Sequence, residues 1–143
     1  ILSGNWILVF LVNLCSQYAS WLGFLCGAPQ HYGMQADVPD HRLCCRTYIT
    51  RGLPAFLYWN MQYHVEHHMY PAVPFHQLPK LRKTIEHDLP PATVGLRATW
   101  KEILDIHRKL VADPTYYFEP QLPTQAESET ATVEDLALEL HPA

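Results

Sequence analysis

Residues 63–71 read YHVEHHMYP, and His64, His67 and His68 in this stretch are three of the chain's nine histidines. Their spacing of i, i+3 and i+4 puts the three imidazoles on one face of a helix. Neutral imidazole binds Zn, Fe, Cu or Ni, and the triplet is flanked by apolar and aromatic residues rather than by a polar loop. The stretch therefore predicts half of a metal site, in preference to a surface run of polar aromatic residues.

The beginning of the chain is strongly apolar. Residues 1–36 contain no Asp, Glu, Lys or Arg, and residues 1–26 are mostly Leu, Val, Ile, Phe, Trp, Ala and Gly. A helix of that length can cross a bilayer core of about 30 Å. We therefore predict a transmembrane helix over residues 1–26, ended by Gly27-Ala28-Pro29, in preference to a buried helix of a soluble protein or a signal peptide. The first basic residues after it, Arg42, Arg46 and Arg51, predict that this end faces the cytoplasm.

The middle of the chain predicts shorter helices. An aromatic-rich helix over residues 55–70, after a break at Gly52-Leu53-Pro54, would carry the three histidines at the membrane interface or in a buried position. Two amphipathic cytosolic helices are predicted within residues 75–112, one ending near Asp88 and one from Arg97 to Ala112. The pattern of residues 43–50 fits a short helix and an extended segment equally well.

The end of the chain differs in composition from the rest. Residues 119–143 hold six acidic residues and no Lys or Arg, which predicts a disordered acidic tail after a domain part at residues 1–118. No basic block indicates nucleic-acid binding. The predicted fold class is therefore all-α, with an integral membrane helix followed by interfacial and cytosolic helices.

Two residues near the triplet, and one farther away, are further candidates for the site. On a helix that continues back from the triplet, Asn60 shares the histidine face, and we predict that it supports a metal ligand by hydrogen bonding. Glu66 points away from that face, which predicts that it orients a neighbouring imidazole or meets solvent. His31 is the best additional metal ligand, because it follows the apolar helix at the same membrane surface. The histidines predicted to be structural or exposed are His41, His76, His87, His107 and His141.

The triplet alone leaves the metal open. Three histidines suit a catalytic zinc with one open position, and equally one face of a dinuclear iron site completed from elsewhere. The HExxH pattern of zinc proteases is absent. No catalytic side chain other than the metal ligands is predicted.

The triplet and its surroundings resemble a known family. His64-Val65-Glu66-His67-His68, followed by MYPAVPF at residues 69–75 and LPKL at 78–81, resembles the third histidine box of the membrane fatty acid desaturases and the segment after it. Residues 30–33 (QHYG) and 37–43 (DVPDHRL) resemble the region upstream of that box in bacterial and fungal members. The resemblance covers residues 21–91.

The resemblance implies an activity and a set of ligands. It implies an integral membrane, non-haem di-iron oxidoreductase that desaturates a fatty acid or lipid, using O₂ and electrons from a donor such as ferredoxin or cytochrome b5. His64, His67 and His68 match the metal ligands of the third box, and His31 resembles an additional ligand found between the second and third boxes. The irons would lie on the cytoplasmic side, with the C-terminus.

The chain departs from the family in one respect. The family implies two earlier boxes, HxxxH and HxxHH, and residues 1–63 supply neither. We therefore expect the chain, which begins at Ile1 within an apolar run, to be the C-terminal part of a longer protein and to be inactive alone. Because hydroxylation begins with the same hydrogen abstraction, a lipid or hydrocarbon hydroxylase remains an alternative. A non-catalytic membrane fragment with at most a partial metal site and a zinc hydrolase are further alternatives.

Overall fold

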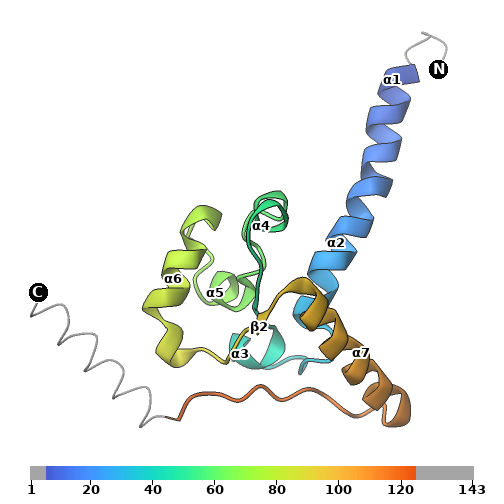
Figure 1. The fold of residues 1–143 in the computed structure, drawn as a ribbon. Coiled ribbons are helices and arrows are strands. Elements are labelled where there is room, and N and C mark those ends of the chain that lie inside the picture. The colour runs from blue at the N-terminus through green and yellow to red at the C-terminus, as the bar shows by residue number, and fades with distance from the viewer. Residues whose placement is uncertain (1–5, 125–143) are drawn as a thin grey trace, which may run out of the picture.

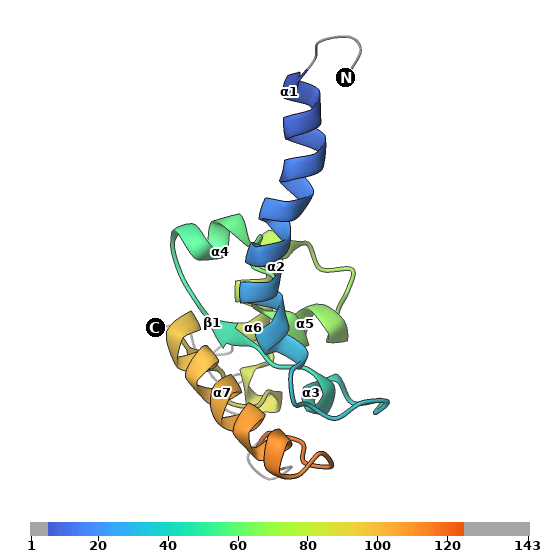
Figure 2. The same ribbon diagram turned by 90° about the vertical axis from the view of Figure 1, so that its right-hand side faces the viewer.

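The computed structural model describes residues 6–124, and its most prominent feature is a helical rod that projects from the compact part (Figures 1 and 2). The rod comprises α1 (Trp6–Val9), the π-helical segment η1 (Phe10–Leu14) and α2 (Cys15–His31). Within residues 6–124, no individual helix combines the length and apolar character needed to cross a membrane. Residues 1–5 of the predicted transmembrane helix lie outside the described part. The exposed apolar side chains of the rod include Trp6, Ile7, Leu8, Phe10, Leu11, Val12, Trp21 and Phe24.

The rod continues past the point where the sequence predicts its end. Gly27-Ala28-Pro29 does not end the helix, because α2 runs to His31 with Pro29 inside it. Proline lacks the N–H that would bond the carbonyl of Leu25, four residues earlier. That carbonyl instead accepts a hydrogen bond from Trp100 Nε1 at 2.8 Å. The predicted end is therefore wrong, because a side chain distant in sequence supplies the missing donor.

The segment after α2 contains both a helix and a strand. α3 (His41–Cys44) begins after Asp40, whose carboxylate accepts a hydrogen bond from the backbone N–H of Arg42 at 2.9 Å. β1 (Tyr48–Ile49) pairs in parallel with β2 (Thr93–Val94) and forms a two-stranded sheet. Residues 43–50, for which the sequence left a short helix and an extended segment open, thus contain the end of one helix and one short strand. The predominantly helical class is confirmed, with this short sheet as its addition.

The single helix predicted over residues 55–70 is wrong. Two short helices occupy the region, α4 (Leu53–Leu57) and α5 (His64–Met69). Between them, Trp59 and Asn60 adopt left-handed backbone with φ values of 55° and 53°. A right-handed helix cannot pass through such residues, so α5 takes a direction of its own. The aromatic composition of the region contained no signal for this turn.

Two helices follow α5 within residues 75–112, where two are predicted, although the first ends at Thr84 rather than near Asp88. α6 (Leu78–Thr84) lies between two short 3₁₀ turns, η2 (Phe75–Gln77) and η3 (Glu86–Asp88). α7 (Leu96–Ala112) packs against the end of α2 that enters the compact part (Figure 1).

The buried faces of these two helices differ from the predicted ones. α7 buries Thr99, Ile103 and Ile106, whereas its apolar residues Leu104 and Val111 are exposed. Arg82 of α6 is buried although it is a basic residue. Tertiary packing therefore rotates each buried face away from the one that apolar spacing alone indicates.

A small core lies behind α5. Cys45, Val65 and Leu89 form a buried cluster, with Met69 and Ile85 packed against it. Burial raises the pKa of the Cys45 thiol above its ordinary range, with the neighbouring Cys44 adding to the effect. The core holds the apolar side of α5, so that the opposite side of the helix is presented to the end of α2.

The segment after α7 is extended and returns across the compact part. The backbone N–H of Phe118 donates to the carbonyl of Gly33 at 2.6 Å, next to the end of α2. Residues 119–124 have no regular secondary structure. Most of the predicted acidic tail, residues 125–143, lies outside the described residues.

Replacing Gly33 by alanine is expected to destabilise the protein by roughly 2–4 kcal/mol. Gly33 has a φ of +70°, and a Cβ atom there would lie 2.3 Å from Cγ2 of Ile106 on α7. The cost therefore combines backbone strain with a steric clash. Thermal unfolding of the purified protein measures it.

Gly52→Ala is the matched control, because Gly52 has a φ of +68° and a Cβ atom there would meet no other atom within 4 Å. The difference between the two variants isolates the clash with Ile106. Equal losses of stability would show that α7 does not pack against Gly33 as described.

Candidate metal centre

Three histidines from two distant segments converge at the base of the rod. His31 Nε2 lies 2.7 Å from His64 Nε2, and His68 Nε2 lies 3.1 Å from the same atom. The ligand nitrogens of all three lie within 4.8 Å of one another. Within residues 6–124, this is the one group of three or more His, Cys, Asp or Glu side chains close enough to share a metal ion.

Local helix geometry explains why these side chains meet. His64 begins α5 and His68 follows four residues later, so the two rings stand one turn apart on one face. His31 is the last residue of α2, and its ring lies edge-on to the rings of both His64 and His68. The structure thus brings His31 to His64 and His68, and its role as an additional metal ligand stays a prediction.

A backbone carbonyl fixes the tautomer of His31. Its Nδ1 lies 3.2 Å from the carbonyl oxygen of Cys44 at the end of α3. A carbonyl can only accept, so Nδ1 carries the proton and Nε2 is the ring nitrogen directed at the cluster. Metal-binding histidines commonly have this arrangement, with one ring nitrogen donating to a carbonyl and the other facing the metal.

Burial and neighbouring imidazoles favour the neutral form of His64 and of His68. Burial, followed by the neighbouring imidazoles of His68, His31 and His67, lowers the pKa of His64 to about 3. Burial and the rings of His31 and His41 also lower the pKa of His68. A metal ion must displace a proton from a charged imidazolium ring before it can bind, but a neutral imidazole already has a free lone pair. His64 and His68 can therefore act as ligands at neutral pH without this cost.

His67 belongs to the same helix but not to the group of three. Its ring centroid lies 6.2 Å from that of His64 and 6.0 Å from that of His68. Its Nδ1 is buried and has no hydrogen-bond partner within the described part of the chain. An unsatisfied buried nitrogen of this kind costs free energy unless a ligand or a bound water takes it up.

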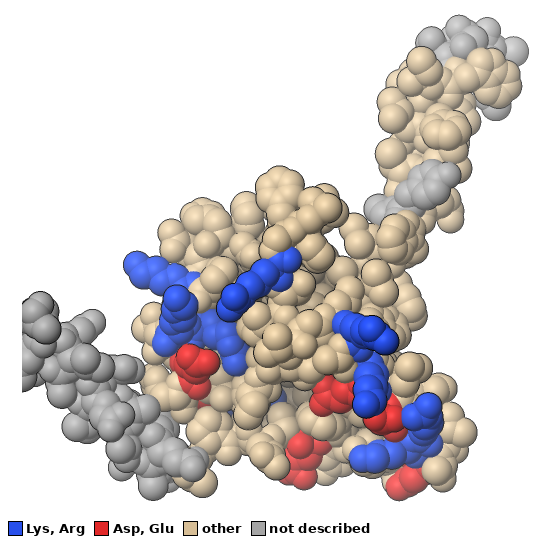
Figure 3. Space-filling view, in the orientation of Figure 1, with Lys and Arg blue, Asp and Glu red and all other residues tan. Residues whose placement is uncertain are grey.

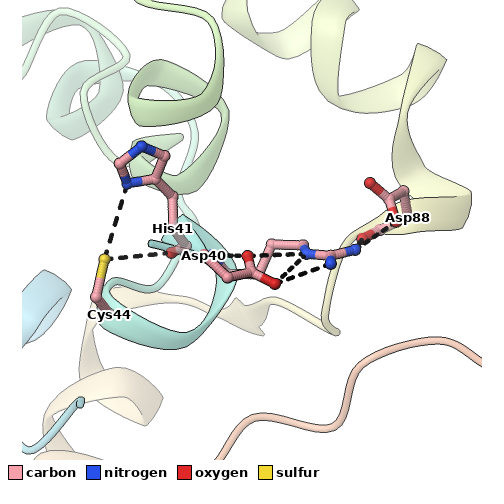
Figure 4. Close-up of polar contacts among 5 residues, drawn as sticks. Asp40, His41, Cys44 and Asp88 are labelled. Atoms are coloured by element: carbon pink, nitrogen blue, oxygen red, sulfur yellow. Dashed lines mark hydrogen bonds and ion pairs between the residues drawn. The ribbon is translucent and has the colours of Figure 1, made fainter. Parts of the chain in front are cut away.

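His41, which the sequence pattern assigns to a structural or exposed role, lies against the cluster. Its ring centroid is 5.3 Å from that of His68. Figure 4 shows His41 at the start of α3, with its Nδ1 directed at Cys44 Sγ, 3.9 Å away. The sequence offered one signal, a histidine directly after Asp40 at a helix start, but nothing in that signal points to α5.

An ion-pair network holds this part of α3 in place. The guanidinium of Arg42 pairs with Asp40 at 2.9 Å and also with Asp88 at the end of η3 (Figure 4). The hydrogen bond from Arg42 lowers the pKa of Asp40 below its ordinary value. The network connects the start of α3, which contains His41, to the segment after α6.

Asn60 does not share the histidine face. It lies in the left-handed turn between α4 and α5, so the helical wheel that placed it beside His64 does not apply. Within residues 6–124, its side chain makes no hydrogen bond to a histidine of the cluster. The backbone of Asn60 instead shapes the turn, accepting from the N–H of Tyr63 at 3.1 Å.

Glu66 points away from the cluster as predicted, but it neither orients an imidazole nor meets solvent. Its side chain is fully buried, and its two oxygens lie 2.5 Å from Arg82 Nη1 and 2.5 Å from Thr47 Oγ1. Arg82 also donates to the carbonyl of Pro90 at 3.3 Å. The prediction of its surroundings was wrong because Arg82 and Thr47 reach Glu66 only through tertiary packing.

The residues present fit a transition-metal site. Three converging imidazoles, one of them hydrogen-bonded to a backbone carbonyl, form a nitrogen donor set of the kind that iron or zinc binds. Within the described residues, no carboxylate or thiolate joins them. A site with three protein ligands leaves coordination positions for ligands from outside residues 6–124, for a second metal or for a substrate molecule.

Comparison with known proteins identifies a family for this chain. The family model described as "Fatty acid desaturase" matches residues 1–100, which is more than half of the chain. The chain is also 37% identical, over 86 residues, to the sphingolipid delta(4)-desaturase of Komagataella phaffii strain GS115. That match covers 57% of this chain and 22% of the yeast protein, so the chain spans about a fifth of the relative's length. No solved structure matches. The histidine box at His64–His68 therefore lies within the matched region, and the chain belongs to the fatty acid desaturase family.

Proposed function

We propose that this chain is the C-terminal part of a membrane-bound, non-haem di-iron oxidoreductase that introduces a double bond into a fatty acyl or sphingolipid chain. The observation that carries the proposal is the convergence of His31, His64 and His68 from segments more than 30 residues apart. The family match over residues 1–100 supports the class of reaction. The name of the yeast relative supports a lipid substrate.

The described residues have distinct roles in this proposal. His31, His64 and His68 would bind one iron, and His67 would offer its ring to the second, with the remaining ligands supplied outside this chain. When bound, the iron pair would supply the oxidising power that activates O₂ and removes hydrogen from an unactivated C–H bond. The carbonyl of Cys44 holds His31 in the tautomer that presents Nε2 to the cluster, and His41 packs beside His68. Electrons would come from a donor such as ferredoxin or cytochrome b5.

The exposed apolar surface supports membrane attachment. Besides the rod, α4 exposes Leu53, Phe56 and Leu57. α4 lies on the side of the compact part from which the rod projects (Figures 1 and 2). Insertion of such surface into lipid removes it from water. We infer that the rod and α4 contact the bilayer, with the histidines and the C-terminus on the cytoplasmic side.

Metal analysis and turnover of the full-length protein test the proposal. We expect two irons per molecule and an unsaturated product from a long-chain acyl lipid, formed only with O₂ and a reductant. This chain expressed alone is expected to bind fewer than two irons and to be inactive, because one cluster of three histidines cannot hold both metals.

Other outcomes would favour other activities. A hydroxylated product with the same cofactor requirement would indicate a hydroxylase. Turnover without O₂ or reductant would indicate a zinc hydrolase. A full-length protein with neither iron nor turnover would overturn the proposal in favour of a non-catalytic membrane protein.

A further inference from the structure

A shallow groove of about 800 Å³ lies along the first turns of α7 and is not part of the histidine cluster. Its apolar lining comes from Val94, Trp100 and Leu104, of which Val94 and Leu104 are largely exposed. Arg97 and Lys101 also line it, and both are exposed. Since they are four residues apart on one helix, their cationic ends stand on the same face. The groove thus combines an apolar floor with a basic edge.

The positive charge at this edge has no acidic partner among residues 6–124. Within the described part of the chain, neither Arg97 nor Lys101 forms an ion pair. The acidic residues of α7 are engaged elsewhere, because Glu102 pairs with Arg46 at 3.5 Å and Asp105 pairs with Arg108 at 2.6 Å. Figure 3 shows basic side chains over α7 below the rod, with acidic side chains beside them. The free charge makes an anionic ligand the complementary occupant.

The groove adjoins the exposed apolar rod. The ring of Trp100 lies 5.7 Å from the ring of Phe24 on α2, and its Nε1 donates to the carbonyl of Leu25. Phe24 is exposed, whereas Cys26, two residues later, is buried. Arg97 and Lys101 therefore stand close to the level at which the rod passes from an apolar exposed segment into the compact part. Trp side chains favour this level in membrane proteins, and basic residues there attract anionic lipid.

We propose that this groove binds the headgroup of an anionic phospholipid, with Arg97 and Lys101 on the phosphate and with Val94, Trp100 and Leu104 against the upper part of the acyl chains. The inference rests on the membrane attachment in the proposed function. An acidic protein partner fits less well, because the basic pair is contiguous with apolar surface on the groove and on the rod. Among the described residues, no acidic side chain lines the groove to oppose the phosphate.

Lipid competition on the full-length protein in neutral detergent tests the site. Dioctanoyl phosphatidylglycerol and dioctanoyl phosphatidylcholine are offered in equal amounts, and bound lipid is counted by native mass spectrometry. We expect the wild type to prefer phosphatidylglycerol by about tenfold or more, because each basic residue near anionic lipid contributes roughly a fivefold factor. The double variant Arg97→Ala/Lys101→Ala should bind both lipids equally.

Arg108→Ala/Lys109→Ala is the matched control, since it removes the same charge from the same helix outside the groove. We expect it to retain the preference. The site is refuted if both double variants lose the preference alike, or if the wild type has none. Displacement of the lipid by inorganic phosphate or by hexaglutamate at equal concentration would also contradict it, because the ligand would then be a free phosphate or an acidic protein.

Iron content, measured on the same samples, separates this result from the proposed function. The Arg97→Ala/Lys101→Ala variant is expected to keep the iron of the wild type, since neither residue contacts the histidines. Protein that selects anionic lipid but holds no iron would refute the di-iron proposal alone. Protein that holds iron but shows no lipid preference would refute the lipid site alone.

Discussion

Replacing His64 by alanine in the full-length protein is expected to lower product formation by more than about 100-fold and to reduce the bound iron. His64 Nε2 is the atom that both His31 Nε2 and His68 Nε2 approach, at 2.7 and 3.1 Å. Its loss therefore removes the shared centre of the cluster rather than one of several equivalent donors. Loss of residues that merely orient a ligand already costs about 10–100-fold, and loss of a ligand should exceed this. Turnover and iron content of the purified variant measure the effect.

His76→Ala is the matched control for His64→Ala. His76 is an exposed histidine in η2, eight residues beyond His68, and lies outside the cluster. We expect it to keep wild-type iron and turnover. A His64→Ala protein that retained both would refute the assignment of the cluster.

His67→Ala separates the two parts of the proposed site. It removes the ring whose buried Nδ1 has no partner among the described residues, but leaves the three converging nitrogens in place. We expect product formation to be abolished while the protein still inserts into membranes and retains part of its iron. Wild-type turnover in this variant would show that His67 is not a ligand and that its ring is only part of the packing.

Arg82→Ala is expected to destabilise the protein by about 3–5 kcal/mol, because it leaves the buried carboxylate of Glu66 without its positive partner. Glu66 is fully buried, and the side chain of Arg82 is 10% exposed. Solvent cannot compensate the carboxylate at that depth. Thermal unfolding of the purified protein, at one protein and detergent concentration, measures the loss.

Two comparisons show whether the ion pair itself causes the effect. Lys83→Ala, the next residue on α6 and exposed, should change stability by no more than about 0.5 kcal/mol. The double variant Glu66→Met/Arg82→Met should be more stable than Arg82→Ala, because it leaves no unpaired charge. If Lys83→Ala lowered the stability as much as Arg82→Ala, the effect would come from changes to α6 in general and not from the ion pair with Glu66.

The same ion pair connects the stability of the fold to the histidine cluster. Glu66 lies on α5 between His64 and His67, and Thr47 Oγ1, which donates to Glu66, accepts from the N–H of Val65 at 3.2 Å. These contacts fix the side of α5 opposite to the imidazoles. The buried pair thus holds the orientation of the helix that presents His64 and His68 to His31.

The sequence by itself was sufficient for the features that depend on local spacing. The i, i+3 and i+4 positions of His64, His67 and His68 required one helical turn, and α5 supplies it. The amphipathic pattern before Asp113 predicted α7 nearly to its ends. The histidine box and the residues after it indicated the family, which the match over residues 1–100 confirms. Each of these conclusions depends on neighbours within a few residues, where helix geometry is nearly fixed.

The tertiary structure alone decided which distant groups meet. Trp100 Nε1 supplies the bond that Pro29 cannot make, so α2 reaches His31 and carries it to His64. The left-handed turn at Trp59 and Asn60 redirects α5 and removes Asn60 from the histidine face. Arg82 satisfies Glu66, and His41 packs on His68, although no spacing in the sequence relates either pair. Contacts of this kind depend on how distant segments pack in three dimensions. The periodicity of residues along the chain reports only on near neighbours and does not predict this packing.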